Sequence, residues 1–245
     1  MLTKNETVSL SKSLFTILKV ENCFIKTEFH QRHEKQLLRN MHQFNNLNRI
    51  LEIGENHLES YLQWNNQNIP NMPITKYDHF IELITLLCNH GLATYELLKR
   101  FFLETLDLEL LNSKTNSKII KTSTWGTLTM AISKLTNVNE QISNELFDID
   151  FRNTLAHDSW YLDEGSMRYV APKNKKEIAI PYARLHEKIQ LIFVFYHVMT
   201  DQYFRLYFPE MTQEYENGLG KVMDIIFPLY IASPRQDDVQ KSSQP

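Results

Sequence analysis

Apolar residues recur at helical spacing over two long stretches of this chain, and this feature constrains the fold most strongly. Spacings of three, four or eight residues place side chains on one face of an α-helix. The first stripe consists of Phe80, Ile84, Leu87, Tyr95, Leu98, Phe102 and Leu106, and the second of Leu185, Ile189, Ile192, Tyr196, Met199, Tyr203 and Leu206. Both stripes predict long helices that pack into a core, and the second is also long enough to form a dimer seam.

The composition supports a fold made mainly of helices. The 245 residues include only 6 glycines and 8 prolines, which suits long helices better than a sandwich with many turns. Shorter stripes predict helices within residues 9–64 and from Trp125 to Leu135, and the first of these includes Leu37, Met41, Phe44, Leu47, Leu51 and Leu58. We therefore expect an all-α bundle of about five to seven helices.

One segment breaks the helical pattern. The sequence SWYLDEGSMRYVAP indicates two short strands joined by a turn at Asp163, Glu164 and Gly165. Pro181 then suits the first turn of the last long helix. The expected fold is therefore all-α with one small β-hairpin.

Composition shifts divide the chain into three parts. Residues 65–73, NNQNIPNMP, contain two prolines and interrupt the helical pattern. We expect an N-terminal helical extension and connector over 1–74 and a principal helical domain over 75–231. The polar residues 232–245 have little to bury and should form a disordered tail.

Charge and cysteine content limit the class of protein. The chain has 26 Lys and Arg against 29 Asp and Glu, so its net charge of -3 offers no general attraction to phosphate. Cys23 and Cys88 are too few and too isolated for a disulfide framework or a zinc cluster, and we expect buried thiols. Because the sequence has no signal-peptide pattern and no long apolar run, we expect a cytoplasmic protein without a membrane segment.

The stretch FDIDFRNTLAHDSWYLDEG, residues 147–165, concentrates the polar groups that best suit chemistry. We expect a helix here, with Ile142, Leu146 and Ile149 facing the core. At about 100° per residue, Asn153 and His157 lie one turn apart on a single face. Arg152 lies about 100° away from Asn153, a gap that its long side chain can cross.

The residues RNTLAH, from Arg152 to His157, resemble the signature of the HEPN superfamily, in which an arginine and a polar residue precede a histidine. The resemblance covers the motif strictly and the order of helix, motif, hairpin and helix over 75–208 loosely. It implies a metal-independent endoribonuclease that acts as a homodimer, with two copies of the motif meeting across one cleft. A role in defence or stress response, as in the toxins of this superfamily, follows only from the resemblance.

Each motif residue suits one part of RNA cleavage by the ribose 2′-hydroxyl. His157 can transfer a proton as general base or general acid. Arg152 stays charged and can bind two phosphoryl oxygens, while Asn153 would orient the phosphate or the imidazole. These roles require no metal or cofactor. Some superfamily members are modified at a tyrosine two positions after the histidine. This chain has Ser159 there, so the sequence identifies no regulatory partner of that kind.

The same residues also permit a structural interpretation. Arg152 can cap the helix or pair with Asp148, Asn153 can bond backbone groups, and His157 can end the helix. The chain would then be a non-catalytic helical module for dimerisation, interaction or RNA binding.

Two further groups have weaker signals. His30 and His33, with His42 nearby, have the spacing of metal ligands, but solvated histidines on a polar helix face are the commoner case and no acidic partner completes a site. The basic segment 173–177 offers Lys173, Lys175 and Lys176 to RNA phosphates if the hairpin flanks the cleft. A solvated loop is the equally good alternative.

Overall fold

The computed structural model describes residues 2–29, 74–119, 123–137, 145–163, 168–173 and 176–209. The chain divides into two compact units, residues 1–203 and 204–245, and the elements described below belong to the first unit except for the end of the last helix. The described residues form six helices and a three-stranded sheet, which confirms the predicted all-α bundle with a small β element. The stripe at 37–58, the connector at 65–73 and the tail at 232–245 lie outside the described residues.

Helix α1 (Lys4–Val20) begins before residue 9, where the first helix was expected to start. The Thr3 hydroxyl accepts a hydrogen bond from the Glu6 N–H at 3.2 Å, and the Glu6 carboxylate accepts one from the Thr3 N–H at 2.6 Å. This reciprocal pair satisfies two N–H groups at the helix start. Leu14 and Leu18 lie on the buried face of the helix.

The sequence predicts one helix that starts at Thr75 and is ended by the polar residues 112–118. The structure has two helices there, so that prediction is wrong at its end. Helix α3 (Ile74–Thr105) stops, and α4 (Leu108–Thr115) begins with Asp107 as its cap. The break arises from contacts distant in sequence: Leu106 forms a β-bridge with Phe24, and the Asp107 N–H donates to the Cys23 carbonyl at 2.7 Å. Asp107 also accepts hydrogen bonds from two N–H groups of the first turn of α4.

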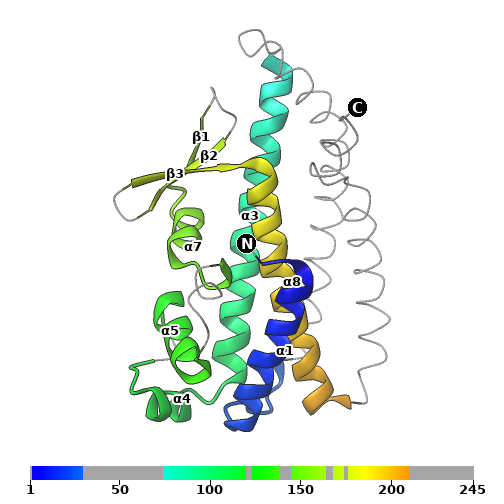
Figure 1. Ribbon diagram of the computed structural model, residues 1–245, viewed down its shortest axis with the longest axis vertical. Coiled ribbons are helices and arrows are strands. Elements are labelled where there is room, and N and C mark those ends of the chain that lie inside the picture. The colour runs from blue at the N-terminus through cyan, green and yellow to red at the C-terminus, as the bar shows by residue number, and fades with distance from the viewer. Residues whose placement is uncertain are drawn as a thin grey trace, which may run out of the picture. The chain divides into compact units, whose positions relative to one another are not determined.

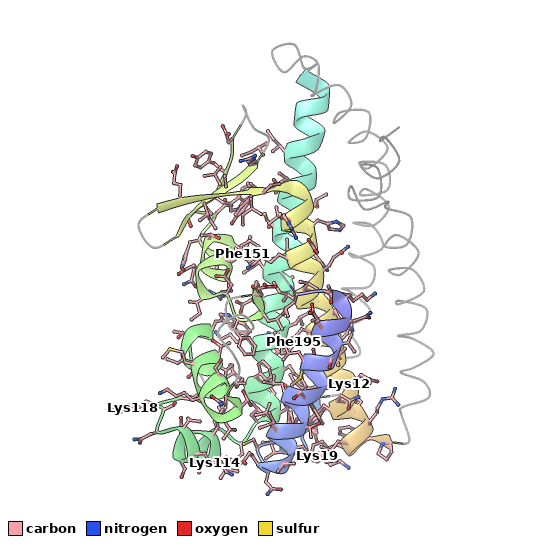
Figure 2. All side chains as sticks on the ribbon, viewed as in Figure 1. Lys12, Lys19, Lys114, Lys118, Phe151 and Phe195 are labelled. Carbon is pink, nitrogen blue, oxygen red and sulfur yellow. The ribbon has the colours of Figure 1, made fainter. Side chains whose placement is uncertain are left out.

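Aromatic side chains form much of the core. Phe24 stacks on Phe15 with ring centroids 4.5 Å apart, and Tyr203 lies edge-on to Phe101 at 5.7 Å. Figure 2 shows Phe195 inside the bundle, while Lys12 and Lys19 of α1 and Lys114 and Lys118 of the α4 region extend from its surface. The apolar stripe of the last helix, α8 (Tyr182–Tyr207), is buried from Leu185 to Tyr203, as expected for core packing.

The strands β1 (Tyr161–Asp163), β2 (Arg168–Lys173) and β3 (Lys176–Pro181) form an antiparallel sheet in the order β1-β2-β3. The predicted hairpin corresponds to β1 and β2, although residues 164–167 of its turn lie outside the described residues. The third strand was not predicted. It pairs along the whole of β2, so Pro181 ends a strand instead of starting α8.

The motif lies on a short helix, α7 (Ile149–Ala156), which Figure 1 shows beside α3, with the sheet at one end and α5 (Trp125–Thr136) at the other. Asp148 caps α7, so Leu146, which was expected on the motif helix, precedes it as a buried residue, and Ile142 lies outside the described residues. Among the described helices, none combines the length and the apolar character needed to cross a lipid bilayer.

Candidate functional site

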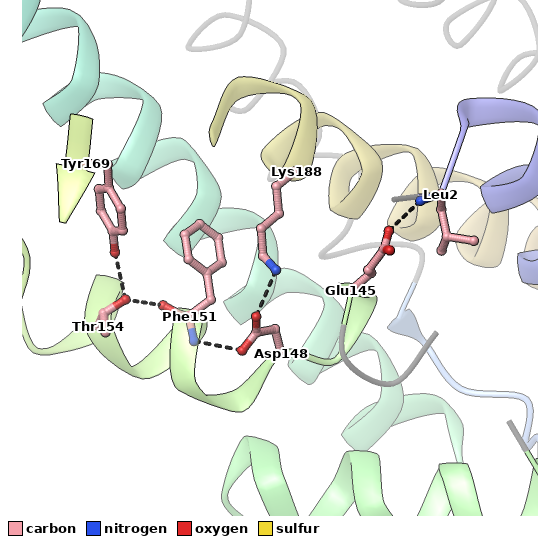
Figure 3. Close-up of polar contacts among 7 residues, drawn as sticks. All are labelled: Leu2, Glu145, Asp148, Phe151, Thr154, Tyr169 and Lys188. Atoms are coloured by element: carbon pink, nitrogen blue, oxygen red, sulfur yellow. Dashed lines mark hydrogen bonds and ion pairs between the residues drawn. The ribbon is translucent and has the colours of Figure 1, made fainter. Parts of the chain in front are cut away.

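The start of α7 is fixed by a buried carboxylate. Asp148 accepts a hydrogen bond from the Phe151 N–H at 3.0 Å through Oδ1, and Oδ2 accepts one from Nζ of Lys188 at 2.8 Å (Figure 3). The Asp148 and Lys188 side chains are only 8% and 15% exposed. Because Lys188 is on α8, this ion pair links the beginning of the motif helix to a core helix.

The inner face of α7 holds the helix against three elements. The Thr154 hydroxyl lies 2.7 Å from the Tyr169 hydroxyl of β2 and donates to the Phe151 carbonyl at 2.7 Å (Figure 3). The ring of Phe151 lies under Lys188 Nζ, 4.9 Å from it, and edge-on to Tyr95 of α3. These contacts determine which face of α7 remains at the surface.

The end of α7 places His157. Its N–H donates to the Asn153 carbonyl at 3.0 Å, which makes it the C-terminal cap of the helix. Asp158 follows with a left-handed φ of 50°, and the Ser159 N–H donates to the Thr154 carbonyl at 3.1 Å. This is the hydrogen-bond pattern of a Schellman motif, which usually has glycine at the left-handed position. The turn leaves the His157 side chain exposed.

The three predicted site residues come together on the outer side of α7. Asn153 and His157 are exposed, and the Arg152 side chain is 18% exposed. Nη1 of Arg152 donates to Oδ1 of Asn153 at 3.3 Å, so the arginine crosses the gap on the helix surface as expected. The structure thus gathers an arginine and an amide directly, with the imidazole one turn further along the same face.

Sequence reasoning missed one group at this site. Nη2 of Arg152 donates to Oε1 of Glu96, an α3 residue whose side chain is 46% exposed. The predicted alternative, an ion pair between Arg152 and Asp148, is wrong, because Asp148 is occupied by Lys188. The structural role predicted for His157 is confirmed, since this residue does end the helix.

Arg152, Tyr95 and Trp125 each carry a buried polar atom. Nε of Arg152, the Tyr95 hydroxyl and Nε1 of Trp125 are all inaccessible, and none has a hydrogen-bond partner in the described part of the chain. Tyr95 and Trp125 meet edge-on with ring centroids 5.3 Å apart. Burial raises the pKa of Tyr95, an effect that nearby Asp148 strengthens and Arg152 partly opposes. The phenol therefore stays neutral at physiological pH.

Two residues of the basic segment after the motif belong to the sheet. Lys173 ends β2 and Lys176 begins β3, and their Cα atoms are paired opposite each other, so the alternative of a solvated loop does not hold for these two residues. Lys175 lies outside the described residues. Because β2 packs on α7 through Tyr169 and Thr154, the sheet that carries these lysines adjoins the motif helix.

The alternative metal site at His30, His33 and His42 also lies outside the described residues. Within the ranges that the structure does describe, no group of three or more histidine, cysteine or acidic side chains has a geometry that could hold a metal ion. The positive charge at the site described above comes from Arg152.

We compared the chain with known protein families, sequences and structures. No family model, curated protein sequence or solved structure matches this chain.

Proposed function

We propose that this chain is a metal-independent endoribonuclease that cleaves RNA by attack of the ribose 2′-hydroxyl. The observation that carries the proposal is the gathering of Arg152, Asn153 and His157 on the exposed side of a helix whose inner face is firmly anchored. The resemblance of RNTLAH to the HEPN motif points to the same activity. A role in defence or stress response is part of this proposal.

Arg152 supplies the charge that the reaction needs. Attack on a phosphodiester builds negative charge on the phosphoryl oxygens, and a guanidinium can donate hydrogen bonds to two of them. Nη2 donates to Glu96 and Nη1 donates to Asn153. Each of these nitrogens carries a second N–H, and these second donors would bind the phosphate. The arginine can therefore stabilise the transition state without a metal ion.

His157 transfers the proton. As the 2′-oxygen bonds to phosphorus, its proton passes to a base, and the bond from phosphorus to the 5′-oxygen breaks as that oxygen accepts a proton from an acid. One imidazole supplies one of these two roles in a given turnover, and a second copy of the motif supplies the other. We therefore propose a homodimer in which two α7 helices face one RNA strand.

Asn153 and the sheet complete the proposed RNA contacts. The Asn153 amide orients the arginine through its oxygen and leaves its NH₂ group for the phosphate. Lys173 and Lys176 stand at strand ends of the sheet next to α7, and we propose that the lysines of this segment, Lys175 included, bind neighbouring phosphates.

A cytoplasmic location belongs to the same proposal. Cys23 and Cys88 are both buried and free, as suits a reducing compartment. Burial raises the pKa of each thiol, so neither is a reactive thiolate at neutral pH.

The test is RNA cleavage by purified protein in excess EDTA. Wild-type protein should cleave a single-stranded RNA, and His157→Ala should not, while Arg184→Ala provides a matched change at an exposed α8 residue and should keep full activity. Light scattering should give a dimer. Absence of cleavage by a dimeric wild-type protein with every RNA offered would contradict the activity.

A non-catalytic interaction module is the second candidate, and one observation favours it. Glu96 already neutralises Arg152, and His157 has a structural place as a helix cap. In that case the protein would dimerise or bind RNA without cutting it. Filter binding of RNA by a protein that leaves the RNA intact would support this alternative.

A further inference from the structure

A carboxylate from a distant part of the chain lies against the motif arginine. Glu96 is on α3 and forms an ion pair with Arg152 of α7. The helices can approach closely here because α3 carries Gly91, where a Cβ atom would lie 3.0 Å from Ile189 Cγ1 and 3.3 Å from Leu155 Cδ1. The ion pair therefore joins α3 and α7 at the solvent-exposed edge of their interface.

The contacts of Arg152 hold its guanidinium at two points. Nη2 contacts Glu96 and Nη1 contacts Asn153, while Nε is buried without a hydrogen-bond partner among the described residues. A free arginine samples many rotamers of similar energy. Without Glu96, the 3.3 Å contact to the exposed amide of Asn153 is the remaining hydrogen bond among the described residues that holds the end of the side chain.

The ion pair has more effect on geometry than on stability. Glu96 is 46% exposed, and ion pairs exposed to this extent contribute little to the free energy of unfolding. A phosphate-binding guanidinium, in contrast, must be aligned with the position where charge develops. Losing the restraint should therefore affect turnover without unfolding the protein.

We propose that Glu96 is a positioning residue that holds the guanidinium of Arg152 in the orientation required at the site. Its effect on catalysis rests on the proposed function, whereas its effect on the order of the Arg152 side chain does not. Glu96 acts through Arg152 and does not itself take up the proton of the 2′-hydroxyl.

Kinetics of RNA cleavage test the role through a double-mutant comparison. Glu96→Gln removes the charge with almost no change in shape, and it should lower kcat about tenfold with little change in KM, because misalignment of a charge-stabilising group slows the chemical step. In the Arg152→Ala protein the same Glu96→Gln change should have no further effect. Glu109→Gln, an exposed residue in the first turn of α4, is the matched control and should leave kcat unchanged.

A second measurement needs no catalytic activity. The NMR signal of the Arg152 Nε–Hε group, assigned from its loss in Arg152→Lys, should show slow solvent exchange in wild-type protein because Nε is buried. Glu96→Gln should accelerate this exchange and broaden the signal, whereas Glu109→Gln should not. Melting temperatures of all variants confirm that the fold is intact.

The outcomes separate this proposal from the proposed function. An unchanged Arg152 signal in Glu96→Gln would overturn the positioning role, as would an equal loss of activity with and without Arg152, which would make Glu96 an independent catalytic group. If wild-type protein cuts no RNA, the proposed function fails, and the exchange of the Arg152 signal still decides whether Glu96 orients that side chain.

Discussion

The carboxylate of Asp148 and the ammonium group of Lys188, 2.8 Å apart and largely buried, join the N-cap residue of the motif helix to α8. Asp148 also caps α7, since its second oxygen accepts the Phe151 N–H. The orientation of the outer side of α7, where Arg152 and His157 lie, therefore depends on a buried ion pair on its inner side.

Asp148→Ala should lower the free energy of unfolding by about 3 kcal/mol, because it removes the cap and leaves the Lys188 charge buried without its partner. Asp148→Asn keeps an acceptor for the cap and should cost less. Urea denaturation measures both. The exposed pair of Lys114 and Glu21 is the control, and Lys114→Ala should cost much less than Asp148→Ala. Equal costs for the two pairs would contradict the structural role of Asp148.

His157→Ala should change stability by less than about 0.5 kcal/mol, because the side chain is exposed and the capping hydrogen bond comes from the backbone N–H. His197 offers a buried comparison on α8, where its ring packs edge-on against Phe193 at 4.1 Å. His197→Ala should cost about 2 kcal/mol or more. Thermal unfolding of the two variants checks the contrast, and a large cost at His157 would show that the imidazole has a structural role instead.

Stability should fall as the solution is acidified below neutrality. Burial lowers the pKa of His90 and of His186 to about 4, and the His186 charge contributes to the shift at His90. An unfolded imidazole titrates near 6.5, so between about pH 6.5 and pH 4 the unfolded chain binds protons that the folded chain does not. The free energy of unfolding should therefore decrease with falling pH, by at most about 1.4 kcal/mol per pH unit for each imidazole.

Urea denaturation between pH 7 and pH 5 measures this dependence. His186→Gln removes one of the two titrating groups and retains a polar side chain one turn from Gln190, whose amide nitrogen lies 2.7 Å from the imidazole. Its unfolding free energy should vary less steeply with pH than that of wild-type protein. A slope that stays the same in His186→Gln would exclude this imidazole as a source of the acid sensitivity.

The motif helix and its setting were predictable because their signals are local. RNTLAH lies within eleven residues of the strand signal at Tyr161, and the geometry of a helix is enough to expect Arg152 to reach Asn153. Glu96 was not predictable in this way. It is 56 residues away from Arg152 in sequence, and nothing in the pattern of α3 distinguishes it from other exposed polar residues on that helix.

The errors in the fold have similar causes. The apolar stripe of α3 continues to Leu106, so local periodicity predicts no break, and the hydrogen bond that the Asp107 N–H donates to the Cys23 carbonyl imposes one through tertiary contact. The third strand did leave a signal, since Ile178 and Ile180 alternate with other residues at a period of two. That run is short, and its basic start resembled a solvated loop.

The proposed reaction predicts a specific set of RNA ends. With Arg152 for charge and His157 for proton transfer, attack by the 2′-hydroxyl should give a 2′,3′-cyclic phosphate and a 5′-hydroxyl. Cleavage should persist in EDTA, fail on DNA, and fail on RNA that carries a 2′-O-methyl group at the cut. Mass spectrometry of the fragments identifies the ends.

Variants of the motif should rank by role in this assay. Arg152→Ala and His157→Ala should each lower cleavage about a hundredfold or more, the usual scale for losing a charge-stabilising donor or a general acid or base. Asn153→Ala should cost less, because Glu96 still holds the guanidinium of Arg152. Activity that requires magnesium, ends that carry a 5′-phosphate, or undiminished cleavage by His157→Ala would each contradict the mechanism and favour the non-catalytic module.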